Sequence, residues 1–503
     1  MLLLLGAVAL AAHCAVNFRY GFFRDELYYI QWSERLAWGY VEQPPFTALA
    51  VYITRLLLGH SLFALRFPPA LVHAALVVLT GLMAREMGGK RLAQGLAALC
   101  VLLGPIFMAN NALMTMNSFD QLFWALCLYI LIRRIQTGNA RLWYWFGLWA
   151  GLGLMNKLTM GFFGVGLIIA LLLTSYRKDF LRKEIWIGGA IAAALFAPFV
   201  IWLATHDWCT IEFMRQYGAG GKTVQAGFLQ WLYMQILTVH PLTLPIWLLG
   251  LWSCFMDAEG KRFRVLAWFF VVMYAMFFAL KAKFYFLSPA FPILFAAGAV
   301  PIERWCMRPA RRAFAGVYLA ILALTGAALA PLAMAVLPVP ALLKYTAAIG
   351  VNAGVTTEQV TETELPQHFA DQFGWEAMVE SVAKVYHGLP PEDRAQCAIF
   401  TANYGEAAAI DFYGPAHGLP PAISGHNTYY IWGPGHATGQ VLIAVVSERR
   451  REALEQVYED VRLAGRNDNA GLAMPYERGQ VFYLCRGLKA PLEEIWPGVK
   501  SYN

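Results

Sequence analysis

Long hydrophobic runs separated by short polar loops fill the first two thirds of the chain. Residues 1–16 are apolar and uncharged, and we expect them to form the first transmembrane helix, because a signal peptide would carry a basic segment ahead of its apolar core. Most of the later runs have the roughly 17–25 residues that cross a bilayer, and a few are shorter. The pattern predicts eleven spans, the later ones at about 69–84, 92–109, 118–132, 142–155, 158–175, 185–204, 235–256, 265–280, 286–302 and 313–336.

The stretch between the first two spans, residues 17–68, is expected to form a long loop with helices at the membrane surface. Residues 25–38 have the pattern of a short amphipathic helix, which lies in an interface rather than spanning it. Residues 44–59 are apolar, but the run is short and is broken by Arg55, so we expect a helix lying against the membrane, with a further span as the alternative. The residues of the first helix expected to face water are Gln31, Glu34 and Arg35.

The remainder of the chain, residues 338–503, has the mixed pattern of a soluble α/β domain. Turn signals rich in glycine and proline separate its elements. Cys397 and Cys485 fall on two predicted strands, and a disulfide between them is expected in an oxidising compartment, with two buried free thiols as the alternative. The predicted strands are 397–404, 440–446 and 480–485, and the predicted helices are 375–386 and 449–463.

Composition supports a membrane domain, residues 1–337, joined to a separate domain. The chain is 59% hydrophobic and only 14% charged, whereas a soluble domain carries about 25% charged residues. The membrane part has 27 Lys+Arg and 13 Asp+Glu, a net charge of +14, and the rest has 12 and 19, a net charge of −7. Because the basic excess belongs to the membrane part, it does not indicate nucleic-acid binding. The eight cysteines show no metal-ligand spacing.

The basic residues also predict an orientation. The five loops that follow even-numbered spans carry 17 lysines and arginines, and such loops face the cytoplasm. The first loop and the C-terminal domain are then expected on the opposite side, which is the periplasmic side of a bacterial inner membrane.

Two acidic residues, Asp25 and Glu26, stand side by side next to the predicted membrane surface. Acidic residues at membrane depth are energetically expensive, so a functional role is the favoured interpretation. The alternative is an ordinary surface loop in which these acids only interact with water.

Five short motifs follow one another along residues 10–300. In this order and at this spacing they resemble the GT-C glycosyltransferases of the protein-mannosyltransferase and aminoarabinose-transferase (ArnT-like) type, glycosyltransferase family 39 and its relatives. The motifs are Asp25-Glu26, then E-Q-P-P-F at 42–46, L-R-F-P at 65–68, L-G-L-M-N-K at 152–157 and K-A-K-F-Y-F-L-S-P-A-F-P at 281–292.

The resemblance implies a membrane enzyme that moves a sugar from a polyprenyl-phosphate carrier to a glycan, lipid or protein acceptor outside the cytoplasm, with inversion. It implies Asp25 as the catalytic base, and a carboxylate is suited to accept the proton that the acceptor hydroxyl loses. Glu26 would make Asp25 more basic by like-charge repulsion, or orient the helix. Fixed cations are expected at the departing lipid phosphate. The expected donor-binding residues are Lys157, Lys281, Lys283, Arg66, Tyr285, Tyr29, Asn117 and Asp120.

Each of these residues has a plainer alternative role. The lysines would snorkel to the interface, Tyr285 would belong to the interfacial aromatic belt, and Asp120 would be a buried, hydrogen-bonded acid instead of orienting the sugar.

Some positions depart from the family pattern. Gln43 and Tyr28 replace a lysine and an arginine of aminoarabinose transferases, and Asn117 replaces an acid, which argues against aminoarabinose as the sugar. Some relatives hold a metal with the glutamate of the Pro-Pro motif and a later histidine, but the segment around Glu212 has no such histidine. We therefore expect no required cofactor. Glu42 and Glu212 remain a weak pair for a divalent metal, and a structural hydrogen bond from Glu42 is favoured.

Two loops of the C-terminal domain, 403–406 and 425–434, combine aromatic and polar side chains. Such a combination suits sugar or glycolipid recognition, although turn and core roles are slightly favoured. Two other functions remain open for the whole chain. A transporter or flippase of a lipid-linked sugar would show charges within its spans and internal repeats, and a non-catalytic sugar-lipid binder would explain the missing family charges.

Overall fold

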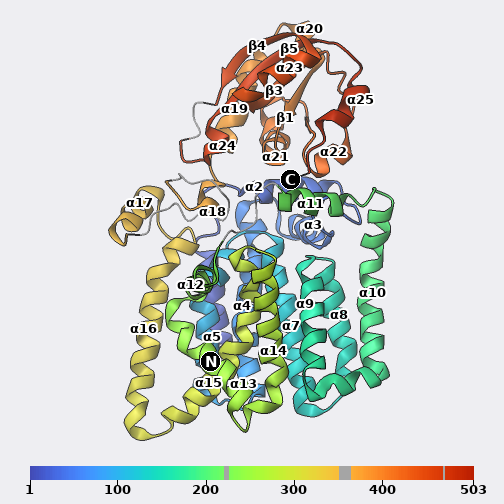
Figure 1. Ribbon diagram of the computed structural model, residues 1–503. Coiled ribbons are helices and arrows are strands. Elements are labelled where there is room, and N and C mark those ends of the chain that lie inside the picture. The colour runs from blue at the N-terminus through green and yellow to red at the C-terminus, as the bar shows by residue number, and fades with distance from the viewer. Residues whose placement is uncertain (220–225, 351–363, 468–470, 503) are drawn as a thin grey trace. The chain divides into compact units, whose positions relative to one another are not determined.

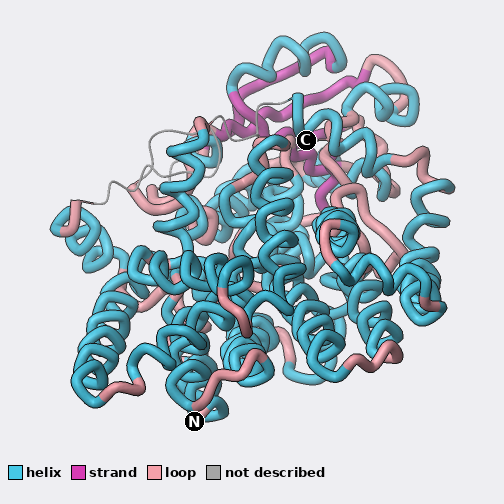
Figure 2. The backbone as a smooth tube through the Cα atoms, turned by 60° about the horizontal axis from the view of Figure 1, so that its bottom comes forward, coloured by secondary structure: helices cyan, strands magenta, loops and turns pink. Residues whose placement is uncertain are grey.

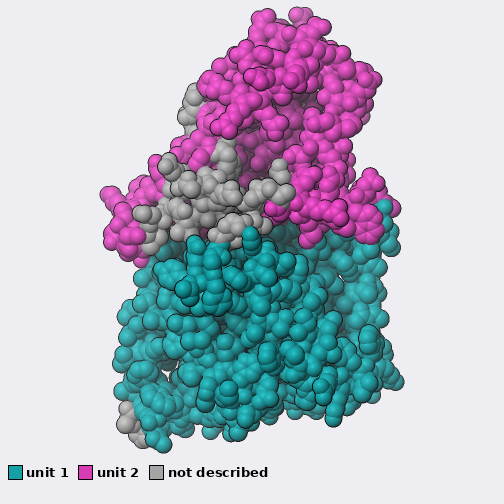
Figure 3. Space-filling model, in the orientation of Figure 1, with its two compact units in different colours: residues 1–19, 43–204, 223–338 teal, residues 20–42, 205–222, 339–503 magenta. Residues whose placement is uncertain are grey.

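The structure is a computed structural model that describes residues 1–219, 226–350, 364–467 and 471–502. Most of the described chain is helical (Figure 1). It divides into two compact units, shown in different colours in Figure 3. The helical unit comprises residues 1–19, 43–204 and 223–338, and the sheet unit comprises 20–42, 205–222 and 339–503. The stretch around Asp25 therefore folds with the C-terminal part of the chain.

The helical unit consists of apolar helices joined by short turns. Its longest helices are α4 (Leu62–Glu86) and α16 (Pro309–Ala333), and a 3₁₀ segment, η4 (Phe284–Ala290), precedes α15. The others are α1 (Leu2–Cys14), α3 (Phe46–Leu58), α5 (Arg91–Leu103), α6 (Pro105–Asn111), α7 (Met116–Thr137), α8 (Leu142–Leu154), α9 (Thr159–Leu172), α10 (Lys183–Ala204), α12 (Phe228–Val239), α13 (Leu244–Met256), α14 (Arg264–Ala279) and α15 (Phe291–Cys306).

Several of these helices are suited to a bilayer. In the described part of the chain, five are long and apolar enough to cross a membrane, or up to eight if each bent pair is one span. Two predicted spans are broken: 92–109 bends by 59° between α5 and α6, and 235–256 bends by 99° after α12. Pro105 and Pro241 follow the breaks, and proline lacks the N–H that would continue the helix. The total of eleven spans stays a prediction.

The helix predicted at 44–59 is present as α3. Its 13 residues are fewer than the roughly 17–25 that cross a bilayer. One face is buried through Ala48 and Val51, while Leu56 and Leu57 are exposed. A helix that hides one face and leaves leucines on the other fits the predicted position against a membrane.

The five basic loops lie on one side of the helical unit, because contacts link them to one another. This common side is what the predicted alternation of spans requires. The linking contacts are Arg133 to Glu86 at 3.5 Å, Arg134 to Asp179 at 2.7 Å, the Tyr176 hydroxyl to the Arg262 carbonyl at 2.9 Å, and the Leu92 N–H to the Glu303 carboxylate at 2.8 Å.

Glycines bring α8 close to α10. A Cβ atom on Gly147 would lie 2.0 Å from the carbonyl oxygen of Gly188, so only glycine allows this approach. The close packing fixes α8, whose C-terminal end leads into Lys157.

The sheet unit contains a five-stranded mixed sheet of order β2-β1-β3-β5-β4 (Figure 2, magenta). Strands β1 and β3 are parallel, as are β1 and β2, while β5 runs antiparallel to both β3 and β4. The strands are β1 (Cys397–Thr401), β2 (Ala422–Ser424), β3 (Val441–Ser447), β4 (Tyr458–Arg466) and β5 (Gln480–Leu488). The helices are α2 (Arg24–Glu34), α11 (Cys209–Ala219), α17 (Val339–Ala348), α18 (Gln367–Ala370), α19 (Trp375–His387), α20 (Pro391–Ala395), α21 (Tyr404–Tyr413), α22 (Thr428–Trp432), α23 (Arg451–Val457), α24 (Pro475–Arg478) and α25 (Leu492–Ile495).

The topology of this sheet brings two distant loops together. Strands β1 and β2 are parallel neighbours, so their carboxyl ends meet at one edge. Tyr404 follows β1 and Thr428 follows β2. Helix α2 packs against α21, which begins at that edge. The two loops singled out in the sequence therefore meet the stretch around Asp25.

Three sequence predictions for this unit are corrected. The helix predicted at 449–463 ends at Val457 and continues as β4, because the chain there pairs with β5 along the edge of the sheet. Gln31 is buried within α2 instead of facing water. Cys397 and Cys485 are free thiols. Since β3 lies between their strands, the two Cα atoms are about 9–10 Å apart, beyond the reach of a disulfide.

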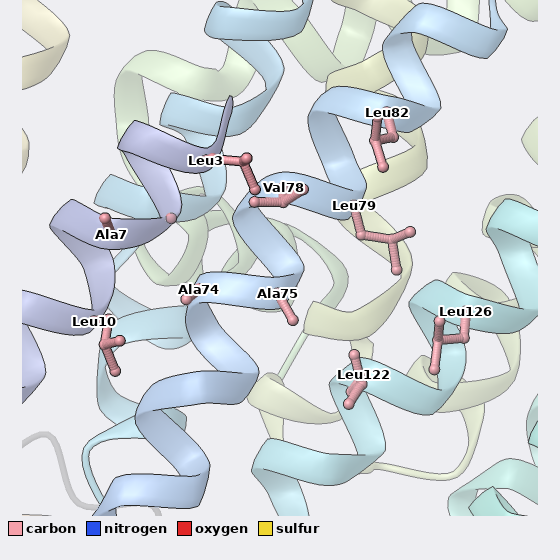
Figure 4. A pocket seen from close by; sticks show the side chains of 11 residues that line it. Leu3, Ala7, Leu10, Ala74, Ala75, Val78, Leu79, Leu82, Leu122 and Leu126 are labelled. Carbon is pink, nitrogen blue, oxygen red and sulfur yellow. The ribbon is translucent and has the colours of Figure 1, made fainter. Parts of the chain in front are cut away.

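An apolar groove runs along the helical unit between α1, α4 and α7 (Figure 4). Small residues such as Ala7, Ala74 and Ala75 leave the space, and leucines such as Leu79 and Leu122 line it. The groove presents only apolar side chains, so it contributes no group for acid–base chemistry or for binding a charge.

Candidate active site

Five of the predicted site residues belong to two clusters of side chains, one in each unit. The lysine cluster lies in the helical unit and comprises Lys157, Asn117, Asp120, Thr159 and Phe286. The aspartate cluster lies in the sheet unit and comprises Asp25, Arg24, Tyr28, Tyr404 and Glu42.

Lys157 occupies the turn between α8 and α9. Its backbone N–H donates to the Gly153 carbonyl at 2.9 Å, which ends α8. The neighbouring Asn156 fixes the turn, since its amide donates to the Met116 carbonyl at 2.9 Å and accepts from the Thr47 hydroxyl. Lys157 is only 7% exposed. A lysine that snorkelled to water would be more exposed, so the position of Lys157 favours a role inside the protein.

The Lys157 ammonium contacts α7 and η4. It donates to Asn117 Oδ1 at 2.7 Å and lies 3.8 Å from Asp120 Oδ2. It also lies 4.2 Å from the centre of the Phe286 ring and 5.7 Å from that of Tyr285, in cation–π geometry. The motifs at 152–157 and 281–292 thus meet around one cation.

Asp120 is engaged by a second partner. The Thr159 hydroxyl, at the start of α9, lies 3.0 and 2.9 Å from its two carboxylate oxygens. The Asp120 side chain is buried. These contacts match the interpretation of Asp120 as a buried, hydrogen-bonded acid, and its role toward the sugar stays a prediction.

The electrostatic surroundings of Lys157 suit an anion. Burial lowers the pKa of its ammonium to about 8, Asp120 acts in the opposite direction, and the positive charge of Lys283 lowers the pKa further. A further anion beside the ammonium would stabilise its charged form. Binding of a phosphate by this cluster stays a prediction.

The other predicted cations are placed differently. Lys283 is half-buried, whereas Lys281 is exposed. Arg66 is buried in α4, where its guanidinium donates to the Arg19 carbonyl at 3.2 Å and its own carbonyl accepts from Asn17. Arg66 therefore has contacts separate from those of Lys157. The roles of Lys281, Lys283 and Arg66 at a phosphate stay predictions.

Asp25 lies in the first turn of α2, where the helix dipole stabilises a negative charge. The Tyr404 hydroxyl donates to Asp25 Oδ1 at 2.8 Å, and Arg24 Nε lies 3.6 Å from the same oxygen. The Asp25 side chain remains 26% exposed. It is thus an anchored carboxylate that a hydroxyl group can still reach.

Glu26 has a structural partner in its own helix. Its carboxylate accepts from the Phe23 N–H at 2.9 Å, and the side chain is fully buried. This is the N-terminal capping contact of α2, and it fits the interpretation in which Glu26 orients the helix. Tyr29 is also buried, with its ring 4.8 Å from Trp32. Catalytic and donor-binding roles for these two residues stay predictions.

Glu42 accepts hydrogen bonds from helix α2 and from helix α22, which lie far apart in the sequence of the sheet unit. Its oxygens accept from the Tyr28 hydroxyl and the Thr428 hydroxyl, each at 3.1 Å. Burial raises the pKa of its carboxyl to about 7, although these hydrogen bonds lower it. Glu212, the other half of the weak metal pair, contacts Lys500 at 2.6 Å.

These partners do not fit a metal site. The described residues contain no group of three His, Cys, Asp or Glu side chains placed to hold a metal ion. The carboxylate oxygens of Glu42 are already used by hydroxyl donors. The favoured structural hydrogen bond of Glu42 is present, and the expectation that no cofactor is required stays a prediction.

Backbone strain accompanies the Glu42 contact. Asn427 has a φ of 52°, a left-handed value that is uncommon outside glycine. Its N–H donates to the Ser501 carbonyl at 2.9 Å, which holds the chain in place. The next residue, Thr428, is thereby directed at Glu42 and at the Val41 N–H.

Sequence reasoning missed several of these partners. Thr159 lies two residues after the motif at 152–157, and Phe286 lies within the motif at 281–292. The motifs therefore indicate where these partners of Lys157 lie in the sequence. At Tyr28 the sequence indicates only that a tyrosine replaces the arginine of aminoarabinose transferases, and it does not predict the contact with Glu42. Tyr404 and Thr428 belong to the two C-terminal loops, but no sequence signal pairs those loops with Asp25.

Comparisons with known proteins agree with the resemblance drawn from the motifs. A family model described as dolichyl-phosphate-mannose-protein mannosyltransferase matches residues 42–202. This region contains every residue of the lysine cluster except Phe286. Lipid A galacturonosyltransferase RgtD from Rhizobium johnstonii is 26% identical over 254 residues, 49% of this chain and 52% of the relative. The chain thus spans about half the length of this curated relative.

Solved structures share the fold along most of the chain. ArnT from Cupriavidus metallidurans bound to undecaprenyl phosphate has a TM-score of 0.64 at 14% identity and covers 96% of this chain and 97% of its own. The Archaeoglobus fulgidus oligosaccharyltransferase in complex with Zn and sulfate has a TM-score of 0.52 at 12% identity, with coverages of 88% and 68%. At these identities the likeness shows the fold alone. Together with the apolar helices that are long enough to cross a membrane, it supports a multi-pass helical membrane protein.

Proposed function

We propose that this chain, which resembles the GT-C glycosyltransferases of the ArnT type, transfers a sugar from a polyprenyl-phosphate carrier to an acceptor at the outer face of a bacterial inner membrane. The observation that carries the proposal is that Lys157 and its partners Asn117, Asp120 and Thr159 lie within the region that the mannosyltransferase family model matches. A buried ammonium that gains from a further anion is suited to the phosphate of a lipid-linked sugar.

The departing phosphate is the first requirement of this reaction. The bond between the anomeric carbon and the phosphate oxygen breaks, and its electron pair leaves with the polyprenyl phosphate. Negative charge therefore grows on the phosphate in the transition state, where a fixed cation in a water-poor site is effective. Lys157 supplies that cation in the proposal, with Asn117 and Asp120 holding its ammonium in place.

Activation of the acceptor is the second requirement. The acceptor hydroxyl forms the new bond to the anomeric carbon on the side opposite the phosphate, so the configuration inverts. The proton of that hydroxyl passes to the Asp25 carboxylate, which acts as the general base. The contacts from Tyr404 and Arg24 go to Asp25 Oδ1, and the proposal assigns Oδ2 to the incoming hydroxyl.

The proposal includes the predicted topology. Eleven crossings, with the basic loops in the cytoplasm, would deliver the C-terminal segment to the periplasm. The short helices α1 and α8, of 13 residues each, would count as crossings where the bilayer is locally thinned. The proposal names the acceptor only by class, as a glycan, a lipid or a protein. It names the sugar only as a hexose, a pentose or a uronic acid.

Reconstitution tests the proposal. The full chain is placed in liposomes with undecaprenyl-phosphate sugars labelled in the sugar, in separate reactions for a hexose, galacturonic acid and aminoarabinose. We expect release of undecaprenyl phosphate together with label on an added acceptor fraction. Label that crosses the bilayer still attached to its carrier would instead indicate a flippase, and label that only binds would indicate a non-catalytic binder.

A further inference from the structure

We infer that Tyr404 is a positioning residue for Asp25, so that the C-terminal segment supplies part of the catalytic machinery. The inference rests on the proposed function, because it concerns the base of that reaction. The two residues are 379 positions apart in sequence, and the Tyr404 hydroxyl donates to Asp25 Oδ1 at 2.8 Å. A hydrogen bond to a carboxylate is stronger than one between neutral groups.

Tyr404 is itself held firmly at the start of α21. Asn403 caps this helix by accepting from the Gly405 N–H at 2.7 Å, and the Glu406 carboxylate accepts from the Asn403 N–H. The Tyr404 N–H donates to His426 Nδ1 at 3.1 Å. The backbone from which the hydroxyl reaches Asp25 is therefore fixed by three hydrogen bonds.

The ring of Tyr404 is fixed as well. It stacks on Tyr28 with ring centres 4.4 Å apart and planes 23° from parallel. The Arg24 guanidinium lies 5.5 Å from the ring centre. Gly405 makes room for this arrangement, since a Cβ there would lie 2.5 Å from Arg24 Cγ. The Tyr404 side chain is packed between residues of α2 and its own helix α21, so it has little freedom to rotate away from Asp25.

The chemical consequence concerns the orientation of the base. Arg24 also attracts Asp25 Oδ1, and it contacts Asp371 as well. Without the tyrosine hydroxyl, the carboxylate is free to rotate toward the guanidinium, and neither oxygen is then aimed at an acceptor. The Tyr404 hydroxyl would act on the orientation of the base and not on the sugar donor, so we expect its removal to slow the chemical step.

The test compares Tyr404→Phe with the matched variant Tyr386→Phe. Both substitutions remove one tyrosine hydroxyl from the sheet unit, and Tyr386 donates to the Arg394 carbonyl, away from Asp25. Tyr404→Phe retains the stacked ring, so we expect a folded protein. We expect kcat for sugar transfer to fall about 10- to 100-fold with KM within about twofold, which corresponds to one hydrogen bond to a charged group. Tyr386→Phe should leave both constants unchanged.

The outcomes separate the inference from the proposed function. If Asp25→Asn abolishes transfer and Tyr404→Phe keeps the parent kcat, the positioning role is wrong and the proposed base stands. If Tyr404→Phe changes KM alone, or Tyr386→Phe lowers kcat equally, the positioning role is also wrong. A parent protein that transfers no sugar from any donor contradicts the proposed function, and the inference falls with it.

Discussion

The lysine cluster and the aspartate cluster fix a charged side chain in different ways. Lys157 is 7% exposed, and its hydrogen-bond partner Asn117 is 40 positions away in sequence. Asp25 is 26% exposed, and its partner Tyr404 is 379 positions away. In the proposed function, the cation that binds the phosphate is enclosed by neighbouring helices, whereas the carboxylate that accepts the proton of the acceptor is accessible and is held by a residue far along the chain.

The largest expected effect tests the lysine cluster. Lys157→Met removes the cation and leaves Asp120 buried without its ionic partner, which costs about 3–5 kcal/mol of stability. We also expect the affinity for undecaprenyl phosphate to fall about 10- to 100-fold, as for the loss of a charge-assisted contact. Binding of undecaprenyl phosphate and thermal unfolding, both in detergent, measure the two effects.

The matched control for Lys157 is Arg134→Met. Arg134 is also buried and paired with a buried acid, Asp179 at 2.7 Å, but it lies among the basic loops. This variant should lose similar stability and keep the parent affinity. Equal losses of affinity in the two variants would mean that the effect is only structural. Equal affinities in Lys157→Met and the parent would remove Lys157 from the phosphate site.

The next effect concerns pH and the aspartate cluster. Burial raises the pKa of Glu42 from 4.5 to about 7, so between these values the folded state binds more protons than the unfolded state. The free energy of unfolding therefore falls as the pH rises through this window, by about 1–3 kcal/mol. Glu42→Gln cannot ionise, so relative to the parent it should gain thermal stability between pH 5 and pH 8.

Other buried acids of the sheet unit require that the melting curve of Glu42→Gln be compared with that of the parent. Burial also raises the pKa of Glu477, to about 8, and that of Glu406. Their contribution is shared by the parent and Glu42→Gln, so subtracting the two melting curves removes it. A difference in melting temperature that is the same at pH 5 and pH 8 would contradict the assignment to Glu42.

The smallest effect is expected for Glu26. Glu26→Gln keeps an oxygen that can accept from the Phe23 N–H, so the cap of α2 is retained. We expect kcat within about twofold of the parent and a change in stability below about 1 kcal/mol. A fall in kcat comparable with that of an Asp25 variant would instead assign Glu26 to the chemistry.

The sequence predicted the helical unit better than the sheet unit, for physical reasons. Lys157 and Tyr285 lie in motifs fixed by local helix ends, and hydrophobic runs mark most helices. Pro105 and Pro241 mark the breaks in two predicted spans, because proline lacks the N–H that continues a helix. Tyr404 gave no signal toward Asp25, because the contact depends on how β1 and β2 pair. The strand after Val457 was missed because an edge strand needs a partner, β5, that lies further along the chain.

The central claim is that Asp25 is the base of a glycosyl transfer. Asp25→Asn keeps the size of the side chain and an oxygen that can accept from the Tyr404 hydroxyl, but it cannot take up the acceptor proton. Single-turnover transfer from an undecaprenyl-phosphate sugar, with the variant fully loaded with donor, measures the chemical step directly. We predict a rate at least about 100-fold below that of the parent, with donor binding unchanged. A variant that transfers sugar at the parent rate would contradict the account.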